Sequence, residues 1–320
     1  MANVGRRTSA SVVGTSQSVG HLVEEVASRL AGCAEPTREA RDLIAALLDV
    51  PRHWPLLREN KWVDSDTWQR ACAAADRRAK GAPLAYAVGR ANFRGLTLDV
   101  DERVLIPRPE TELLVDLVLQ RCRFPVGGTA VDVGTGSGAI AIALATEGTF
   151  ERVIATDISL DALEVARGNA EKCRASVEFI GGNLLTAFDV RGSRFQAGRQ
   201  ASNVERQTSN VVAIVSNPPY ISFEEIRDLP PSVRDWEPAV ALLSSHDGMA
   251  TTAQLVRQAA ARLEAGGLLA LEIDARRASL VAELVSSNGW YQDVSVQLDL
   301  AGRERFVLAT RRGRRGSKND

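Results

Sequence analysis

The sequence predicts an α/β protein with a doubly wound parallel sheet, preceded by a smaller all-α domain. From residue 130 onward, short apolar runs alternate with amphipathic stretches, which is typical of βαβ units. A glycine-rich turn follows the first of these runs, at the point where parallel sheets place their ligands. Before residue 85, apolar residues recur at helical spacing, which indicates a separate helical layer.

The helical domain is expected over residues 21–84, after a disordered tail at residues 1–20. Apolar residues three and four positions apart, such as Leu22 and Val26, predict amphipathic helices. Residues 85–104 then change to alternating apolar residues punctuated by glycines, which predicts a β-hairpin linker.

The larger domain is expected over residues 105–310. The prolines of the segment 105–112 exclude a helix before Thr111. Beyond it, the pattern predicts strands near residues 130–133, 152–156, 177–180, 211–215 and 268–273, and helices near residues 138–145, 160–172 and 252–263. Residues 294–298 and 305–309 predict a terminal antiparallel hairpin.

Two polar segments are expected to lie outside the packed core. Residues 189–210 are rich in Arg, Ser, Gln and Asn, so we interpret them as a disordered insertion. Residues 311–320 form a polar basic tail.

The composition narrows the class of function. Lys and Arg total 39 against 40 Asp and Glu, a formal net charge of -1, which gives no global attraction for nucleic acid or anionic membranes. We expect a cytoplasmic protein, since the chain has no signal peptide and no apolar run of membrane-spanning length. We also expect a monomer. His21, His53 and His246 stand apart from one another and from the cysteines, so no metal site is expected.

A glycine-rich loop joins the first predicted strand to the next helix. With Ala139 it also satisfies the relaxed dinucleotide pattern, so NAD competes as a cofactor, whereas the missing Lys-Ser or Lys-Thr excludes a P-loop. Asp157 ends the following strand, where a carboxylate can accept hydrogen bonds from ribose hydroxyls. The loop residues are Gly134, Thr135, Gly136, Ser137 and Gly138.

The tetrapeptide Asn217-Pro218-Pro219-Tyr220 follows the predicted strand at 211–215. The Asn217 side-chain carbonyl and the Pro218 main-chain carbonyl are acceptors that can hold both hydrogens of an amide or amine nitrogen. Tyr220 can stack on a planar substrate group. An ordinary strand-ending turn is the alternative interpretation.

Asp132, directly before the glycines, separates the two cofactor hypotheses. A carboxylate there can help hold the ammonium group of a methionine moiety, directly or through water, but would repel a pyrophosphate. Together with the tetrapeptide this favours S-adenosylmethionine and methyl transfer to nitrogen. Loop capping is the alternative role for Asp132.

Taken together, these motifs resemble the release-factor glutamine methyltransferases of the PrmC/HemK type over about residues 22–309. The resemblance also rests on the segment Pro107-Arg108-Pro109-Glu110-Thr111-Glu112, on Glu237-Pro238 and Ala241-Leu242, and on Arg78, Gly81, Pro83, Tyr86, Gly89, Phe93 and Gly95. It implies a class I S-adenosylmethionine-dependent methyltransferase fold, Rossmann-like, behind the helical domain.

The resemblance also implies the activity and the partner. It implies methylation of the side-chain amide nitrogen of the glutamine in the Gly-Gly-Gln motif of class-1 translation release factors, hence a role in translation termination, with the helical domain helping to grip the factor. It implies that Asn217 contacts both cofactor and substrate, and that the tetrapeptide forms the glutamine pocket with Asn217, Pro218 and Tyr220 as the catalytic residues. The glycine loop and Asp157 would hold the cofactor.

The chain departs from the family pattern at four places, one of which is Arg276 or Arg277 near a usual glutamine. Asn183-Leu184 stands where the family usually has an acid, although Asn183 can still bond adenine. The insertion at 189–210 precedes the fourth strand, and Asp274 replaces a usual glycine. The glycine loop and the tetrapeptide are intact.

Two other functions remain open from the residues alone. An adenine-N6 methyltransferase of DNA or RNA would present a flipped-out exocyclic amine to the same two acceptors. A catalytically idle cofactor-binding module would use the helical domain to dock a partner. The near-zero net charge argues against a nucleic-acid substrate.

Overall fold

The structure is a computed structural model that describes residues 17–122, 127–186 and 210–313. Its contacts divide the chain into two compact units, with the boundary between Val88 and Gly89. The predicted insertion at 189–210, apart from Asn210, and most of both predicted tails lie outside the described residues.

The first unit is helical, as the sequence predicts. Its core is formed by apolar faces of α1, α2 and α4, including Leu22, Leu43 and Ala71. Ser18 caps α1 and Asp64 caps α4 by accepting a main-chain N–H three residues on. The elements are β1 (Gln17–Ser18), α1 (Val19–Arg29), α2 (Pro36–Leu48), α3 (Trp54–Leu57), β2 (Trp62–Val63), α4 (Ser65–Ala79) and α5 (Leu84–Val88).

The hairpin that was expected as a linker belongs to the second unit. It consists of β3 (Arg90–Phe93) and β4 (Leu96–Asp99), and the helix α5 occupies the start of the segment expected to be β. Asn169 fixes the hairpin, because its Oδ1 accepts from the Asp99 N–H at 2.7 Å and its Nδ2 donates to the Asp99 carbonyl at 2.9 Å.

The helix α6 (Pro109–Arg121) begins earlier than predicted. The prediction that proline excludes a helix before Thr111 was wrong, because Pro109 is the first helical residue. At that place no intrahelical N–H is needed and the fixed φ of proline suits the helix. Thr111 therefore lies in the first turn of α6.

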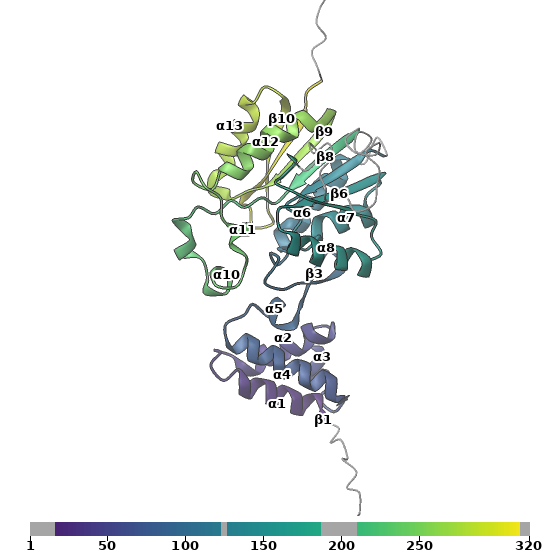
Figure 1. The fold of residues 1–320 in the computed structure, drawn as a ribbon. Helices are drawn as coiled ribbons and strands as arrows, with labels where there is room; N and C mark the ends of the chain where they lie inside the picture. Colours follow the sequence, from purple (N-terminus) through teal and green to yellow (C-terminus); the bar gives the residue numbers. More distant parts are fainter. Residues whose placement is uncertain (1–16, 123–126, 187–209, 314–320) are drawn as a thin grey trace, which may run out of the picture. The chain divides into compact units, whose positions relative to one another are not determined.

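A seven-stranded sheet forms the centre of the second unit (Figure 1). The order is β10-β11-β9-β8-β5-β6-β7, and β11 runs antiparallel to both its neighbours while the other pairs are parallel. This confirms the doubly wound fold with its terminal hairpin. The strands are β5 (Thr129–Val133), β6 (Arg152–Asp157), β7 (Glu178–Gly181), β8 (Val211–Ser216), β9 (Leu263–Glu272), β10 (Tyr291–Leu298) and β11 (Glu304–Arg311).

Helices cover both faces of this sheet (Figure 1). Alternate residues of each strand enter opposite cores: Ala130 packs with α6 and α7 (Ala139–Glu147), whereas Val131 packs with α12 (Ala250–Arg262) and α13 (Ala278–Ser287). The helix α8 (Leu160–Lys172) lies with α6 and α7 and has the predicted bounds. The helix α13 was not predicted.

The chain between β8 and α12 forms an irregular segment over residues 217–249. It contains η3 (Glu225–Asp228), α10 (Pro231–Arg234) and α11 (Ala239–Leu242). Its ends are joined, because the Ile221 N–H donates to the Leu242 carbonyl at 3.0 Å and the Ser244 N–H donates to the Ile221 carbonyl at 2.9 Å. This closure holds the segment beside the carboxyl end of β8. A further 3-10 turn, η4 (Ala275–Arg277), precedes α13.

Candidate active site

A pocket of about 240 Å³ opens at the carboxyl ends of the parallel strands. The chain reverses its direction of winding between β5 and β8, and ligands of doubly wound sheets bind at such a switch point. The pocket is lined by Arg103, Val104, Leu105, Gly134, Gly136, Asp157, Ile158, Ser159, Ala162, Asn183, Leu184, Asn217, Pro219, Pro238, Val240, Ala241, Leu243 and Thr251.

Seven of the residues singled out from the sequence therefore line one cavity. They come from the ends of β5, β6, β7 and β8, which are far apart in the chain but adjacent in the sheet. The seven are Gly134, Gly136, Asp157, Asn183, Leu184, Asn217 and Pro219. Asp132, Thr135, Ser137, Gly138, Pro218 and Tyr220 do not line it.

The glycine loop leaves room for a ligand. Gly134 and Gly136 both have positive φ, and a β-carbon built on either would meet no atom within 4 Å. The loop is anchored from behind, because the N–H groups of Gly134 and Thr135 donate to the Thr156 carbonyl at 2.8 and 3.0 Å. The main chain can thus approach a bound molecule closely while the loop stays fixed.

Asp132 lies beneath this loop and is fully buried. Its Oδ2 accepts from the Thr135 hydroxyl at 2.7 Å and from the Ala141 N–H at 3.1 Å. Burial raises its pKa to about 7, against the lowering effect of those two bonds. Within the described residues, Asp132 Oδ1 has no hydrogen-bond partner. Asp132 shapes the loop, and its predicted contact with an ammonium group stays a prediction.

Asp157 ends β6 next to the glycine loop. Its Oδ2 accepts from the Gly136 N–H and its Oδ1 accepts from the Ser159 N–H, both at 2.9 Å. Burial raises the pKa of this carboxyl, and the hydrogen bonds to the main chain oppose that rise. The carboxylate is held in one orientation at the pocket wall, where its remaining lone pairs can accept from hydroxyls.

Asn217 follows the last residue of β8. The Ser216 hydroxyl donates to the Val133 carbonyl at 2.6 Å, which joins the ends of β8 and β5 and brings Asn217 beside the glycine loop. Asn217 Nδ2 donates to the Thr111 hydroxyl at 3.4 Å. No hydrogen bond to Asn217 Oδ1 is found in the part of the chain that the structure describes, so this carbonyl is available at the pocket.

The two remaining residues of the tetrapeptide, Pro218 and Tyr220, do not line the pocket. Pro218 is buried and Tyr220 is half-buried. Burial, with the nearby Glu272 carboxyl as a second cause, raises the pKa of Tyr220 to about 12. The phenol is thus neutral near pH 7 and cannot serve as a phenolate base.

An ion pair with a buried carboxylate joins two motif segments that lie 129 residues apart in the sequence. Arg108, at the start of α6, donates to Glu237 Oε1 at 2.6 Å, and the Glu237 side chain is 1% exposed. Burial raises the pKa of Glu237, while Arg108 lowers it. The neighbouring Pro238 lines the pocket, so this pair sets one of its walls.

Several lining residues were not predicted as site residues. Ile158 is exposed by 59% and Val240 by 53%, which leaves apolar surface at the pocket. The sequence could have indicated Ile158 as a site residue, because it directly follows Asp157 at a strand end and ligands bind at the edge where the strands end. Arg103 and Thr251 carried no such signal in the sequence.

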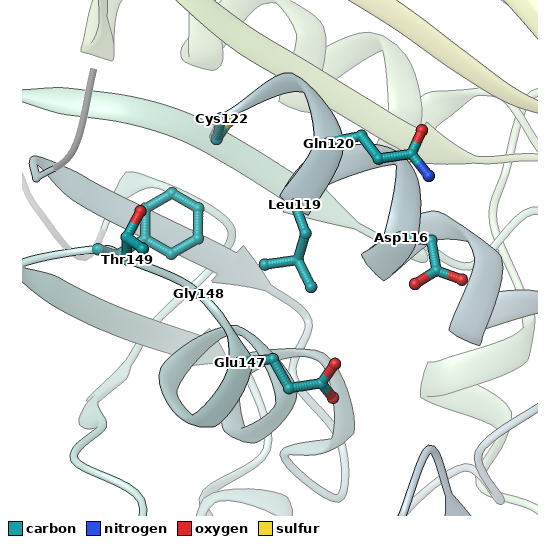
Figure 2. Close-up of a pocket in the computed structure, with 8 residues that line it drawn as sticks. Asp116, Leu119, Gln120, Cys122, Glu147, Gly148 and Thr149 are labelled. Atoms are coloured by element: carbon teal, nitrogen blue, oxygen red, sulfur yellow. The ribbon is translucent and has the colours of Figure 1, made fainter. Parts of the chain in front are cut away.

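A second hollow lies away from these strand ends (Figure 2). Figure 2 shows Leu119 pointing from α6 into the space between that helix and the end of α7. Its two carboxylates, Asp116 and Glu147, are both paired with Arg94, at 2.8 and 2.6 Å. Because both carboxylates are already paired with Arg94, this hollow does not bring together free polar groups that could bind a ligand or catalyse a reaction.

Two other kinds of feature are absent from the described ranges. No cluster of three or more His, Cys, Asp or Glu there could hold a metal ion. None of the helices there is both long and apolar enough to cross a bilayer.

Comparison with known families identifies both units. Residues 21–89 match the family described as PrmC N-terminal domain, and residues 130–214 match the family described as Methyltransferase domain. The first match covers the helical unit, and the second contains the glycine loop and most of β8.

Curated relatives are similar over nearly the full chain. The release factor glutamine methyltransferase of Deinococcus radiodurans is 36% identical, covering 91% of this chain and 98% of the relative. The enzyme of Moorella thermoacetica is 38% identical, covering 92% of this chain and 98% of the relative. The enzyme of Mycolicibacterium smegmatis is 39% identical, covering 88% of this chain and 92% of the relative.

Solved structures share the fold. The hMettl16 catalytic domain, solved in complex with a MAT2A 3′UTR hairpin, is 14% identical with a TM-score of 0.52, covering 76% of this chain and 80% of that one. At this identity the similarity concerns the architecture alone.

Proposed function

Because the chain belongs to the release factor glutamine methyltransferase family, we propose that it transfers a methyl group from S-adenosylmethionine to a glutamine side-chain nitrogen of a class-1 release factor. The glutamine is that of the Gly-Gly-Gln motif. The observation that carries the proposal is Asn217, whose side-chain carbonyl is unpartnered in the described structure and lines the same pocket as the glycine loop. The helical unit would add contacts to the release factor.

The residues present fit the cofactor. Gly134 and Gly136 leave open space beside the main chain, and Asp157 presents a fixed carboxylate for ribose hydroxyls. Asp132 keeps one buried oxygen without a partner in the described structure, next to the loop where an ammonium group would lie. Asn183 and the apolar Ile158 would flank an adenine ring. Bound S-adenosylmethionine supplies an electrophilic methyl group on its sulfonium.

The protein's own contribution is to hold the nucleophile. An amide nitrogen is a poor nucleophile because its lone pair is delocalised into the carbonyl group. If Asn217 Oδ1 and the Pro218 carbonyl accept its two N–H bonds, the lone pair is directed away from them and toward the methyl group. Such positioning can contribute roughly 7 to 11 kcal/mol in favourable cases. The same acceptors would repel the oxygens of a glutamate side chain, so they also confer specificity.

Within the described residues, the two proposed acceptors and the nearby phenol offer no base for the nitrogen. Asn217 and Pro218 do not titrate, and Tyr220 stays protonated near neutral pH because its pKa is about 12. The methylated nitrogen is acidic and can release its proton to water or to a carbonyl acceptor. We therefore propose positioning, rather than proton abstraction, as the source of catalysis.

Transfer of labelled methyl groups tests the proposal. The purified protein would be incubated with labelled S-adenosylmethionine and a class-1 release factor, beside a factor whose motif glutamine is replaced by alanine, single-stranded DNA and RNA. We expect label on the wild-type factor alone, and none with Asn217→Ala. Label on nucleic acid would instead support adenine methylation, and cofactor binding without any transfer would support an idle module.

We also propose that the enzyme acts as a monomer without nucleic acid. Its formal net charge of -1 provides no field that would recruit a polyanion. Light scattering of the active protein should give the mass of one chain.

A further inference from the structure

A chain of hydrogen bonds from two buried residues, neither of which lines the pocket, reaches Asn217. The Thr111 hydroxyl donates to Glu272 Oε2 at 2.7 Å, and Asn217 Nδ2 donates to the same hydroxyl at 3.4 Å. Thr111 is 5% exposed and Glu272 is 2% exposed. Thr111 lies in the first turn of α6, Glu272 at the end of β9, and Asn217 directly after β8. They are far apart in the sequence and come together only in the folded protein.

The direction of these bonds follows from the number of protons. An ionised carboxylate only accepts, so Thr111 must give its single hydroxyl proton to Glu272. The Thr111 oxygen is then left with lone pairs alone and can only accept from Asn217. Of the two ends of the Asn217 amide, only the NH₂ end can satisfy it.

We propose that Thr111 and Glu272 are positioning residues that fix the Asn217 amide with its Oδ1 toward the substrate. This inference rests on the proposed function, in which that oxygen accepts an N–H bond from the glutamine. The two ends of an asparagine amide have nearly the same shape, so packing alone selects poorly between them. If the amide turned over, its NH₂ group would meet the substrate NH₂ group, donor against donor.

The surroundings of Glu272 are compatible with an ionised carboxylate above neutral pH. Burial raises its pKa to about 7, while the Thr111 hydroxyl, Arg305 and Arg108 lower it and Glu110 raises it further. Tyr220, which also lies near Glu272, stays neutral. The nearby cations thus favour the form of Glu272 that can only accept.

Two substitutions at Thr111 distinguish the effect of its hydroxyl group from the effect of its side-chain volume. Thr111→Val keeps the volume and removes the hydroxyl, whereas Thr111→Ser keeps the hydroxyl and removes the methyl group. We expect Thr111→Val to lower kcat on the release factor by on the order of 10- to 100-fold, the effect of leaving buried polar groups without their partner. Thr111→Ser should stay within about 3-fold of wild type. The dissociation constant of S-adenosylmethionine, measured by calorimetry, should change little in both.

Glu272→Gln tests the other end of the chain and keeps the size of the side chain. A glutamine can accept from or donate to Thr111, so it no longer forces the direction of the bonds. We expect a lower kcat with unchanged cofactor binding. If the two residues act through one chain, Thr111→Val combined with Glu272→Gln should be no worse than Thr111→Val alone.

The outcomes distinguish this inference from the function on which it rests. A wild-type protein that labels no release factor overturns both. Wild-type activity in Thr111→Val, or an equal loss in Thr111→Val and Thr111→Ser, overturns only the positioning role. Multiplied losses in the double variant would also overturn it, because independent effects multiply.

Discussion

Gly248 lies directly against the main chain of Tyr220: a β-carbon on Gly248 would be 2.1 Å from the Tyr220 carbonyl oxygen. Gly248 has a φ of +81°, and Arg277 Nε donates to the neighbouring Asp247 carbonyl at 2.5 Å. Arg277 is also paired with Glu225 of η3 at 2.8 Å. The chain that follows the tetrapeptide is therefore held against it by close main-chain contact.

We predict that Gly248→Ala displaces the tetrapeptide and lowers kcat by roughly 100-fold, as misplacement by about 1 Å can do. Gly289→Ala is a matched control, because Gly289 has a φ of +77° but open space around its β-carbon. Both variants should lose about 1 kcal/mol of stability through the positive φ, and the clash with the Tyr220 carbonyl should destabilise Gly248→Ala further. Methyl-transfer assays and urea denaturation of the two variants compare these effects, and equal kcat values would contradict the prediction.

The convergence of the main site residues could be predicted from the sequence. Gly134, Asp157 and Asn217 each lie at the end of a recognisable strand, and neighbouring parallel strands end at one edge of the sheet. The hydrophobic pattern of each strand, together with the rule that ligands bind at the carboxyl ends of parallel strands, was enough to predict this part of the site.

The supporting contacts could not be predicted, because they depend on which distant segments meet. Thr111 and Glu272 are 161 residues apart, and nothing local to either indicates the other. Sequence reasoning also assigned Thr111 to the start of a helix without seeing that Pro109 could begin it. The motif segment at the start of α6 was recognised as distinctive, but its contacts needed the fold.

Two substitutions at Tyr220 distinguish the contribution of its aromatic ring to activity from that of its hydroxyl group. If the ring stacks on the planar amide of the substrate, Tyr220→Phe should keep most of the activity. Tyr220→Ala should lose about 1 kcal/mol or more of transition-state binding, a roughly 5- to 10-fold loss in kcat/KM. Steady-state kinetics of both variants check this, and equal losses would show that the hydroxyl is required.

The ion pair between Arg108 and Glu237 predicts an asymmetric effect of its two partners. Arg108→Ala leaves the Glu237 carboxylate buried and unpaired, which should cost roughly 3 kcal/mol or more. Adding Glu237→Gln to that variant removes the charge and should recover part of the loss. Urea denaturation of both single variants and the double variant forms the required cycle, and strictly additive losses would refute the coupling.

Asp132 predicts how stability depends on pH. Its pKa is about 7 in the fold because of burial, and about 4 in the unfolded chain. The folded state therefore holds this proton more tightly, and stability is lost as the pH rises from about 4 through about 7. The full effect corresponds to roughly 4 kcal/mol.

Asp132→Asn isolates this contribution, because the amide stays neutral at every pH. In the cofactor-free protein, the stability of Asp132→Asn relative to wild type should increase between pH 5 and pH 8. Denaturation curves at the two values measure it. A difference that stays constant or decreases with pH would show that Asp132 has no raised pKa.

Glu272 predicts the pH dependence of catalysis. Below its pKa of about 7 the carboxyl carries a proton and can donate to Thr111, so the Thr111 hydroxyl can turn toward Asn217 and the amide is no longer held. We expect kcat of the wild type to rise between about pH 6 and pH 8 as Glu272 ionises. Glu272→Gln should have a lower kcat without this rise. Asp132 is a second carboxyl with a pKa of about 7, so Asp132→Asn is the control and should keep the rise. A rise that survives in Glu272→Gln but disappears in Asp132→Asn would assign the titration to the glycine loop instead.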